Sequence, residues 1–247
     1  IRDRAVGDRI AIFTNNDDAY RTAHDLHQLG IEIAAVIDSR PEAPKSNSFE
    51  VLSASEVVNT HGRLGLNSID VKTPQGLRQI QVSGLGVSGG WNPNIHLTCH
   101  QRGRPQWDAA LSAFIPSAEL PKGLHVAGAA NGQMTTAAAI DDAVKKAAKI
   151  TKGFGRKPTM LTKLKISDES TSITPFWYVT GTERGWVDQQ NDVTVKDIKL
   201  AHQENFRSVE HLKRYTTLGM ATDQGKTSNV LCLAIMAHTA GQSIPCL

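Results

Sequence analysis

The stretch from His125 to Ala143 combines residue types that suit the binding of a nucleotide. A turn of small residues precedes two threonines at the start of a helix-like run, and the residues of interest are Gly128, Ala129, Ala130, Gly132, Thr135 and Thr136. Small side chains let a ligand approach the backbone, and hydroxyl and amide groups at a helix N-terminus bind phosphate or ribose oxygens. A plain strand–turn–helix packed by alanines has the same pattern, so both interpretations stay open.

A second candidate is the loop Gly-Lys-Thr-Ser-Asn at 225–229, whose residue types also suit a phosphate. Its spacing is not that of a P-loop, because Met220 stands where the first glycine is required and the preceding glycine is Gly219. The spacing argues against a nucleoside triphosphatase. In the alternative interpretation the loop is an ordinary turn in which Thr227 or Ser228 caps a helix.

The elements before these stretches predict a βαβ unit. A buried strand over Arg9–Phe13 leads through a polar turn into a helix that ends near Gly30, and Ile31–Asp38 is the next strand. The turn reads T-N-N-D-D-A, without the glycines of a dinucleotide fingerprint, and its two aspartates would repel a phosphate. Asp38 stands where an acidic residue could bind a ribose hydroxyl. The unit therefore either binds a dinucleotide or is a structural unit in which residues 15–18 cap the helix.

Further along, the periodicity predicts more strands and helices. An antiparallel hairpin is expected over Ser68–Thr73 and Leu77–Val82, followed by a strand that ends in a double glycine at 89–90. A buried strand is expected at His125–Ala127, before a helix over Thr135–Ile150. After residue 188, a cap at Asp192 or Thr194 and helical spacing of apolar residues predict two helices, and an apolar helix follows the polar loop.

Composition excludes several classes of function. The net charge of +3 is small and its basic residues are scattered, which argues against a nucleic-acid partner. No apolar run approaches the roughly 18 residues of a membrane span. The histidines have no metal-ligand spacing, and three cysteines (Cys99, Cys232, Cys246) form no C-x-x-C pair, as suits a reducing cytoplasm. No catalytic acid, base or nucleophile is predicted, and no metal site.

Four stretches together resemble the alpha subunit of heterotetrameric sarcosine oxidase. They are RIAIFTNNDDAYRTAHDLHQLGIEIAAVIDSR, VSGGWNPNIHL, LHVAGAANG and the long segment GWVDQQNDVTVKDIKLAHQENFRSVEHLKRYTTLGMATDQGKTSNV. The resemblance spans essentially the whole chain. It implies an α/β fold: a partial FAD/NAD(P)-binding fold with two dinucleotide-binding domains, followed by a small helical bridge.

The resemblance also implies a division of the chain. Residues 1–88 would form the second dinucleotide-binding-like domain, and 89–150 would return to the FAD/NAD-type domain. Residues 151–187 would be a linker or arm, and 188–247 the helical bridge. We expect the chain to be a piece of a longer polypeptide, with the first strand and its glycine fingerprint before Ile1 and a folate-binding domain after Leu247.

The cofactors and partners are implied in the same way. NAD would lie against the small-residue turn, with contacts at Ala129, Met134 and Thr136, and FMN would lie at a subunit interface near Lys226, Thr227 and Ser228. FAD would be held by the beta subunit, and gamma and delta subunits complete the complex. Sarcosine is oxidised there to glycine with production of hydrogen peroxide, and tetrahydrofolate takes up the one-carbon unit.

Related alpha subunits of amino-acid dehydrogenases and hydrogen cyanide synthase hold a [2Fe–2S] centre with cysteines that this chain lacks, which favours the sarcosine oxidase branch. Leu231 and Cys232, where a small residue is expected, are a departure from the family pattern.

Two other interpretations of the function stay open. One is an NAD(P)H-dependent oxidoreductase or amino-acid dehydrogenase subunit, and the other is a cofactor-free scaffold that docks partner subunits.

Overall fold

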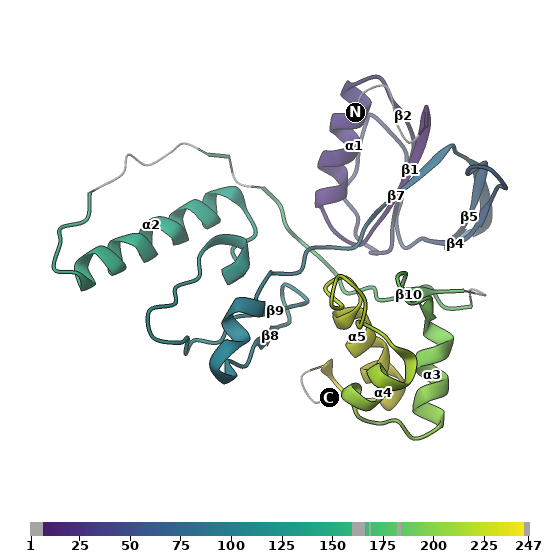
Figure 1. Cartoon of the computed structure of the whole chain (residues 1–247). Coiled ribbons are helices and arrows are strands. Elements are labelled where there is room, and N and C mark those ends of the chain that lie inside the picture. Colours follow the sequence, from purple (N-terminus) through teal and green to yellow (C-terminus); the bar gives the residue numbers. More distant parts are fainter. Residues whose placement is uncertain (1–6, 160–165, 168, 182–183, 245–247) are drawn as a thin grey trace. The chain divides into compact units, whose positions relative to one another are not determined.

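The computed structural model describes residues 7–159, 166–167, 169–181 and 184–244 (Figure 1). The chain divides into two compact units. Unit 1 comprises Ile1–Asn15, Thr22–Val87 and Pro175–Leu247, and unit 2 comprises Asn16–Arg21 and Ser88–Thr174. No helix of the described part is both long and apolar enough to cross a membrane.

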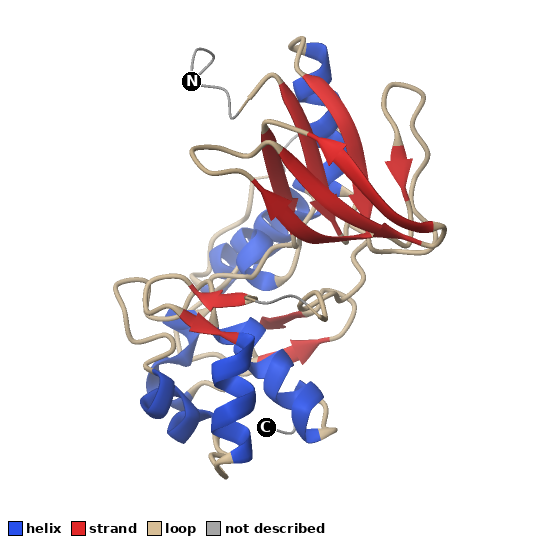
Figure 2. Ribbon diagram, turned by 90° about the vertical axis from the view of Figure 1, so that its right-hand side faces the viewer, coloured by secondary structure: helices blue, strands red, loops and turns tan. Residues whose placement is uncertain are grey.

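Unit 1 is built around a four-stranded sheet. Its strands are β1 (Arg9–Thr14), β2 (Glu32–Asp38), β3 (Val51–Leu52) and β7 (Gly84–Ser88), in the order β3-β2-β1-β7. β1 pairs in parallel with β2, and β2 with β3. Helix α1 (Asp18–Gln28) connects β1 to β2 and lies against one face of the sheet (Figure 2). The predicted βαβ unit and the strand that ends before the double glycine are therefore confirmed.

A second sheet covers the opposite face of the parallel sheet. It is antiparallel and consists of β4 (Glu56–His61), β5 (Ser68–Thr73) and β6 (Gly76–Gln81). One apolar cluster joins the two sheets: Ala11, Ala35, Ile37, Val57, Ile69, Val71, Ile80 and Val82. The hairpin β5–β6 was predicted. β4 was not, because its sequence E-V-V-N-T-H lacks a clean alternation of apolar and polar residues.

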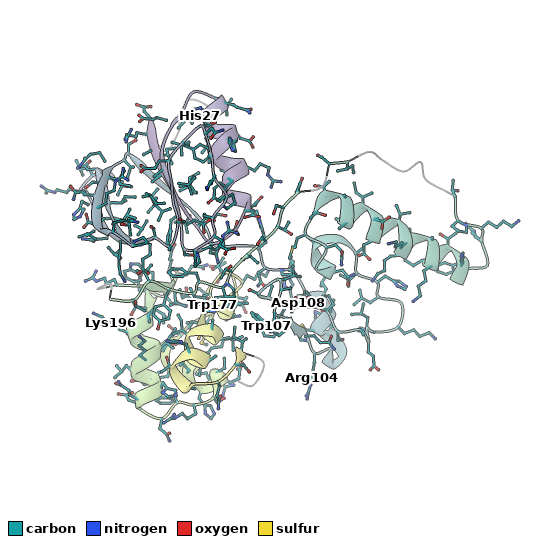
Figure 3. The ribbon with its side chains drawn as sticks, turned by 180° about the vertical axis from the view of Figure 1, so that it is seen from behind. His27, Arg104, Trp107, Asp108, Trp177 and Lys196 are labelled. Carbon is teal, nitrogen blue, oxygen red and sulfur yellow. The ribbon has the colours of Figure 1, made fainter. Side chains whose placement is uncertain are left out.

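The C-terminal part of unit 1 is helical, as expected. Helices α3 (Val195–Gln203), α4 (Val209–Thr216) and α5 (Asn229–Ala240) share a core that includes Ile198, Leu212 and Ile235. Thr194 is the cap: its side chain accepts a hydrogen bond from the Asp197 amide, and the Asp197 carboxylate accepts one from the Thr194 amide, at 2.8 Å. Lys196, on the exposed side of α3, projects outward (Figure 3).

A short antiparallel pair precedes these helices and was not predicted. It is formed by β10 (Trp186–Asp188) and β11 (Val193–Thr194). The Asp188 carboxylate is buried and accepts hydrogen bonds from the amides of Gln190 (2.9 Å) and Gly219 (2.7 Å). One carboxylate thus ties the β10–β11 turn to the loop that leads into α5.

Unit 2 combines short elements with one long helix. They are the 3-10 helices η2 (His96–Arg102) and η3 (Gly128–Asn131), the pair β8 (Gln106–Asp108) and β9 (Ala113–Ile115), and helix α2 (Thr136–Gly153). Trp107 and Asp108 are neighbours on β8 (Figure 3), and the Trp107 ring packs on Phe114 with centroids 5.0 Å apart.

The prediction of a strand at His125–Ala127 is wrong. These residues are extended at Ala127 but belong to no strand, and His125 and Ala127 are exposed. A strand needs a neighbour to which its amides and carbonyls can bond, and no described strand runs beside this segment. The helix that was expected to follow is present as α2.

A buried ion pair closes the end of β2. Asp38 has 0% of its surface exposed, and its carboxylate accepts hydrogen bonds from the Arg40 guanidinium, at 2.7 Å for Nη2 and 3.0 Å for Nε. The carboxylate is therefore not available to a ribose hydroxyl, and the dinucleotide interpretation of the βαβ unit loses its acceptor. The Asn16 side chain accepts from the Asp18 amide at 3.0 Å, which is the capping role of the alternative interpretation.

We expect Arg40→Met to destabilise unit 1 by about 3–5 kcal/mol, because it leaves the Asp38 carboxylate buried without its guanidinium. The exposed Arg63 offers a matched control, and Arg63→Met should change stability by less than about 0.5 kcal/mol. Urea unfolding, monitored by hydrogen exchange of the β1 and β2 amides, measures the free energy of unfolding of both variants. Equal stabilities of the two variants would show that the pair contributes nothing.

Candidate functional site: a cavity beside the start of helix α2

Unit 2 contains a cavity of about 470 Å³ whose wall comes from four segments and from Leu111 in the β8–β9 turn. These are the turn into α1 and its first residues, residues 90–94 after the double glycine, the turn from η3 to the start of α2, and residues 169–173. The N-terminal residues of both α1 and α2 line it. Helix N-termini carry a partial positive charge, which the Asp18 carboxylate at the start of α1 offsets here.

The structure brings together three of the predicted cofactor contacts. Ala129, Met134 and Thr136 all line the cavity. Gly128, Gly132 and Thr135 shape the turn beside it and do not line it. The small side chain of Ala129 leaves the wall open, as the sequence pattern indicated.

The turn itself is held by one carboxylate. Asp142, in the second turn of α2, accepts hydrogen bonds from the Gly128 amide and from the Asn131 side-chain amide, both at 3.1 Å. The turn is thereby tied back onto the helix that follows it. Thr135 caps the same helix, because its hydroxyl accepts from the Ala138 amide at 3.1 Å.

Gly132 is required at its position for two reasons. It adopts the left-handed conformation, with φ of 80°, which L residues with a side chain adopt at a cost. A Cβ atom there would lie 3.1 Å from both Ile115 and Leu111. Leu111 is placed by the β8–β9 turn, where the Asp108 carboxylate accepts from the Leu111 amide at 3.1 Å, and it lines the cavity.

Charged and aromatic side chains meet at the cavity wall. Arg21 Nη1 lies 3.1 Å from Glu169 Oε2, and Arg21 also pairs with Asp18. The Thr136 hydroxyl donates to Glu169 Oε1 at 3.1 Å, and the Trp91 indole N–H donates to Asp18 at 2.8 Å. The charged residues lining the cavity are thus two carboxylates and one guanidinium.

Sequence reasoning missed Trp91 and Glu169. Trp91 follows the double glycine at 89–90, which marks a turn and could have indicated a site. Glu169 falls in the segment expected to be a linker, and no motif surrounds it. It reaches the cavity because Asn16 forms an antiparallel bridge with Ile173, and the Asp17 amide donates to the Ser172 carbonyl at 3.1 Å.

The other predicted contacts lie in unit 1, in the loop before α5. Lys226 and Thr227 are exposed, and the Thr227 hydroxyl donates to Asp223 at 2.8 Å. Ser228 is fully buried, and its hydroxyl has no hydrogen-bond partner among the described residues. The three side chains therefore do not converge on one surface, and a phosphate at this loop would meet Lys226 and Thr227 but not the Ser228 hydroxyl.

The Asp223 carboxylate is part of this loop and was not weighed in the prediction. The Thr227 hydroxyl and the Gly225 amide hold the pKa of Asp223 below its usual value. The carboxylate is therefore ionised at neutral pH and opposes the binding of a phosphate beside Thr227. Among the residues that the structure describes, no group of three or more His, Cys, Asp or Glu side chains could hold a metal ion.

Comparisons with known proteins support the resemblance seen in the sequence. Residues 182–246 match the family model of the sarcosine oxidase A3 domain. The chain is 38% identical over 97% of its length to the sarcosine oxidase subunit alpha of Rhizobium meliloti (strain 1021), and covers 25% of it. It is 33% identical over 97% of its length to that of Corynebacterium sp. (strain P-1), and covers 27% of it. The chain thus spans about a quarter of the length of these relatives.

Among solved structures, the L-proline dehydrogenase from P. horikoshii is similar with a TM-score of 0.70 and 16% sequence identity. The similarity covers 96% of this chain and 46% of that chain. It shows the fold, and the expected partial FAD/NAD(P)-binding fold is confirmed. The chain is also similar to sarcosine oxidase alpha subunits over nearly all of its own length, as the sequence indicated.

We expect Gly132→Ala to destabilise unit 2 more than Gly123→Ala. Both glycines are left-handed, so each alanine has a backbone cost of about 1–2 kcal/mol. Only Gly132 adds a close contact, because nothing lies within 4 Å of a Cβ atom at Gly123. Hydrogen exchange of the α2 amides compares the two variants, and equal protection would contradict the role given to Ile115 and Leu111.

We expect Thr227→Val to raise the pKa of Asp223 toward 3.8, because it removes the hydrogen bond that is the largest cause of the lowered value. In the wild type the interaction is fully present above the ordinary pKa and is lost as the pH falls through the lowered one. Thr222→Val, in the same loop, is the control and should leave the titration unchanged. NMR titration of the carboxyl carbon measures all three proteins.

Proposed function

We propose that this chain is part of the alpha subunit of a multi-subunit flavoenzyme that oxidises sarcosine, and that the cavity of unit 2 contributes to an NAD site. One observation carries the NAD proposal. Ala129, Met134 and Thr136, the contacts implied by the resemblance, line a single cavity of about 470 Å³. This volume lies within the range of small-molecule sites, about 300–1,000 Å³.

The residues fit a dinucleotide in three respects. The turn contributes the small side chains of Ala129 and Ala130 to the wall, and the first turn of α2 presents a hydroxyl at Thr136. The rest of the lining is mixed, with Trp91, Met134 and Leu111 beside polar groups. In this proposal the chain holds one part of NAD, and the phosphate-binding turn expected before Ile1 holds the rest. NAD then has a structural role, because no described residue at the cavity is assigned as acid, base or nucleophile.

The proposal extends to the other cofactors and to the partners. FAD in a beta subunit would oxidise the amine, and tetrahydrofolate would take up the one-carbon unit in the folate-binding domain implied by the resemblance. An FMN site at the interface with a partner subunit would use Lys226 and Thr227, with Ser228 supporting the loop from inside. Gamma and delta subunits complete an assembly that works in the cytoplasm. The names of the relatives, each an alpha subunit, support the multi-subunit assembly.

The test fills the cavity and measures the NAD that the purified protein retains. Ala129→Leu places a larger side chain in the wall, and we expect the affinity for NAD to fall about 5- to 150-fold, because overpacking costs about 1–3 kcal/mol. Ala143→Leu, an exposed position on α2, is the control and should retain NAD at the wild-type level. NAD is assayed in the supernatant after heat denaturation.

The alternatives give different results. A wild-type protein that contains no NAD, or an Ala129→Leu variant that retains all of it, would contradict the NAD site and favour the scaffold. Rapid oxidation of NADH with an added acceptor would favour a working pyridine-nucleotide oxidoreductase, because a structural NAD does not turn over.

A further inference from the structure

We infer that the cavity of unit 2 binds a ribonucleoside through the 2′,3′-diol of its ribose, and that Glu169 selects for these hydroxyls. The inference rests on the proposed nucleotide function and deepens it, because it states which part of the ligand the cavity holds. Four observations carry it: the charge of the lining, the placement of Trp91, the orientation of Glu169, and the segment that fixes Glu169.

The charge of the lining argues against a phosphate inside the cavity. Asp18 and Glu169 contribute two negative charges, and Arg21 contributes one positive charge that both carboxylates already share. A phosphate group in this space would meet a net negative lining and an arginine that is already paired. Hydroxyl groups, in contrast, are neutral donors that a carboxylate binds well. The diphosphate of a dinucleotide is thus expected outside this space and its ribose within it.

Trp91 provides a flat surface for the base. It lines the cavity, and 72% of its surface is exposed. Its ring is oriented by the indole N–H, which donates to Asp18 at 2.8 Å. An aromatic ring that is held at its edge by a hydrogen bond and exposed on its face suits the stacking of a planar base, and any nucleobase can stack on it.

Glu169 is oriented before a ligand binds. Oε1 accepts from the Thr136 hydroxyl and Oε2 pairs with Arg21, at 3.1 Å each. A carboxylate has about four lone-pair positions, so each oxygen keeps one for a further donor. Two neighbouring acceptors match the two adjacent hydroxyls of a ribose, which is the way acidic residues bind ribose in dinucleotide folds.

The segment that carries Glu169 is itself attached to the start of α1. The Asp17 amide donates to the Ser172 carbonyl at 3.1 Å, the Ser170 hydroxyl donates to the Asp17 carboxylate, and Ile173 lies where a side chain on Gly90 would stand. These contacts occupy the turn that a phosphate would use in an ordinary βαβ unit. These contacts place the Glu169 carboxylate, and not an anion-binding turn, beside the start of α1.

The experiment titrates the full chain with nucleosides of known structure. The probes are adenosine, 2′,3′-dideoxyadenosine, nicotinamide riboside and adenosine 2′-monophosphate. We expect at least one of the two ribosides to bind. If adenosine binds, we expect its affinity to be about tenfold or more higher than that of 2′,3′-dideoxyadenosine, because a site that hydrogen-bonds hydroxyls rejects an analogue without them. Adenosine 2′-monophosphate should bind more weakly than adenosine. If nicotinamide riboside binds and adenosine does not, its 2′,3′-dideoxy analogue takes the place of dideoxyadenosine.

Two variants separate the role of Glu169 from a general loss of structure. Glu169→Gln keeps the size of the side chain and removes its charge. We expect the ratio of the affinities for the riboside and its dideoxy analogue to fall toward one. Glu119→Gln removes an exposed carboxylate of the same unit that does not line this cavity, and it should keep the wild-type preference. Unchanged α2 hydrogen exchange in both variants confirms that they fold.

Each outcome bears on one proposal. Equal affinity for a riboside and its dideoxy analogue, an unchanged preference in Glu169→Gln, or no binding of any nucleoside would overturn the inference. The NAD content of the Ala129→Leu protein decides the proposed function independently. If the protein retains NAD but shows no diol preference, the proposed function stands and this inference is wrong. If the protein shows a diol preference but retains no NAD, this inference stands and the proposed NAD site is wrong.

Discussion

The bond between Asp142 and the turn before α2 is the interaction on which the site depends. The backbone hydrogen bonds of a helix do not fix the loop that precedes it, because the first four amides of the helix have no acceptor within the helix. Asp142 solves this by accepting from both Gly128 and Asn131, so that the helix holds its own approach turn. The left-handed Gly132 and the cap at Thr135 then fix the direction in which α2 begins. In this arrangement Ala129, Met134 and Thr136 line the cavity.

The electrostatics of the two candidate sites differ in a way that suits different ligand groups. At the cavity, two carboxylates and one arginine favour hydroxyl donors over an anion. At the loop before α5, Lys226 is an exposed cation, but the ionised Asp223 stands beside Thr227 and reduces the attraction for a phosphate. A partner subunit that supplies further positive charge would make the loop a better phosphate site.

The chain is similar in sequence to sarcosine oxidase alpha subunits, and it shares its fold with a proline dehydrogenase. Fold alone does not determine chemistry, so the assignment of cofactors depends on the cavity and its residues. The βαβ unit illustrates the point. Its strands and helix are those of a nucleotide-binding unit, yet Arg40 holds the Asp38 carboxylate and residues 170–173 cover the turn. The fold is kept while its usual ligand positions are filled by the protein itself.

The sequence by itself determined the elements whose signal is local. Apolar periodicity located β1, α1, β2 and the three C-terminal helices, and the small-residue turn with its threonines located the start of α2, because these patterns follow from backbone geometry within a few residues. The tertiary structure decided whatever depends on distant neighbours. His125–Ala127 forms no strand because no described strand pairs with it, and Ser228 is buried by packing that its own loop does not reveal. Glu169 and Trp91 reach the cavity only through contacts between segments far apart in the chain, which no local pattern encodes.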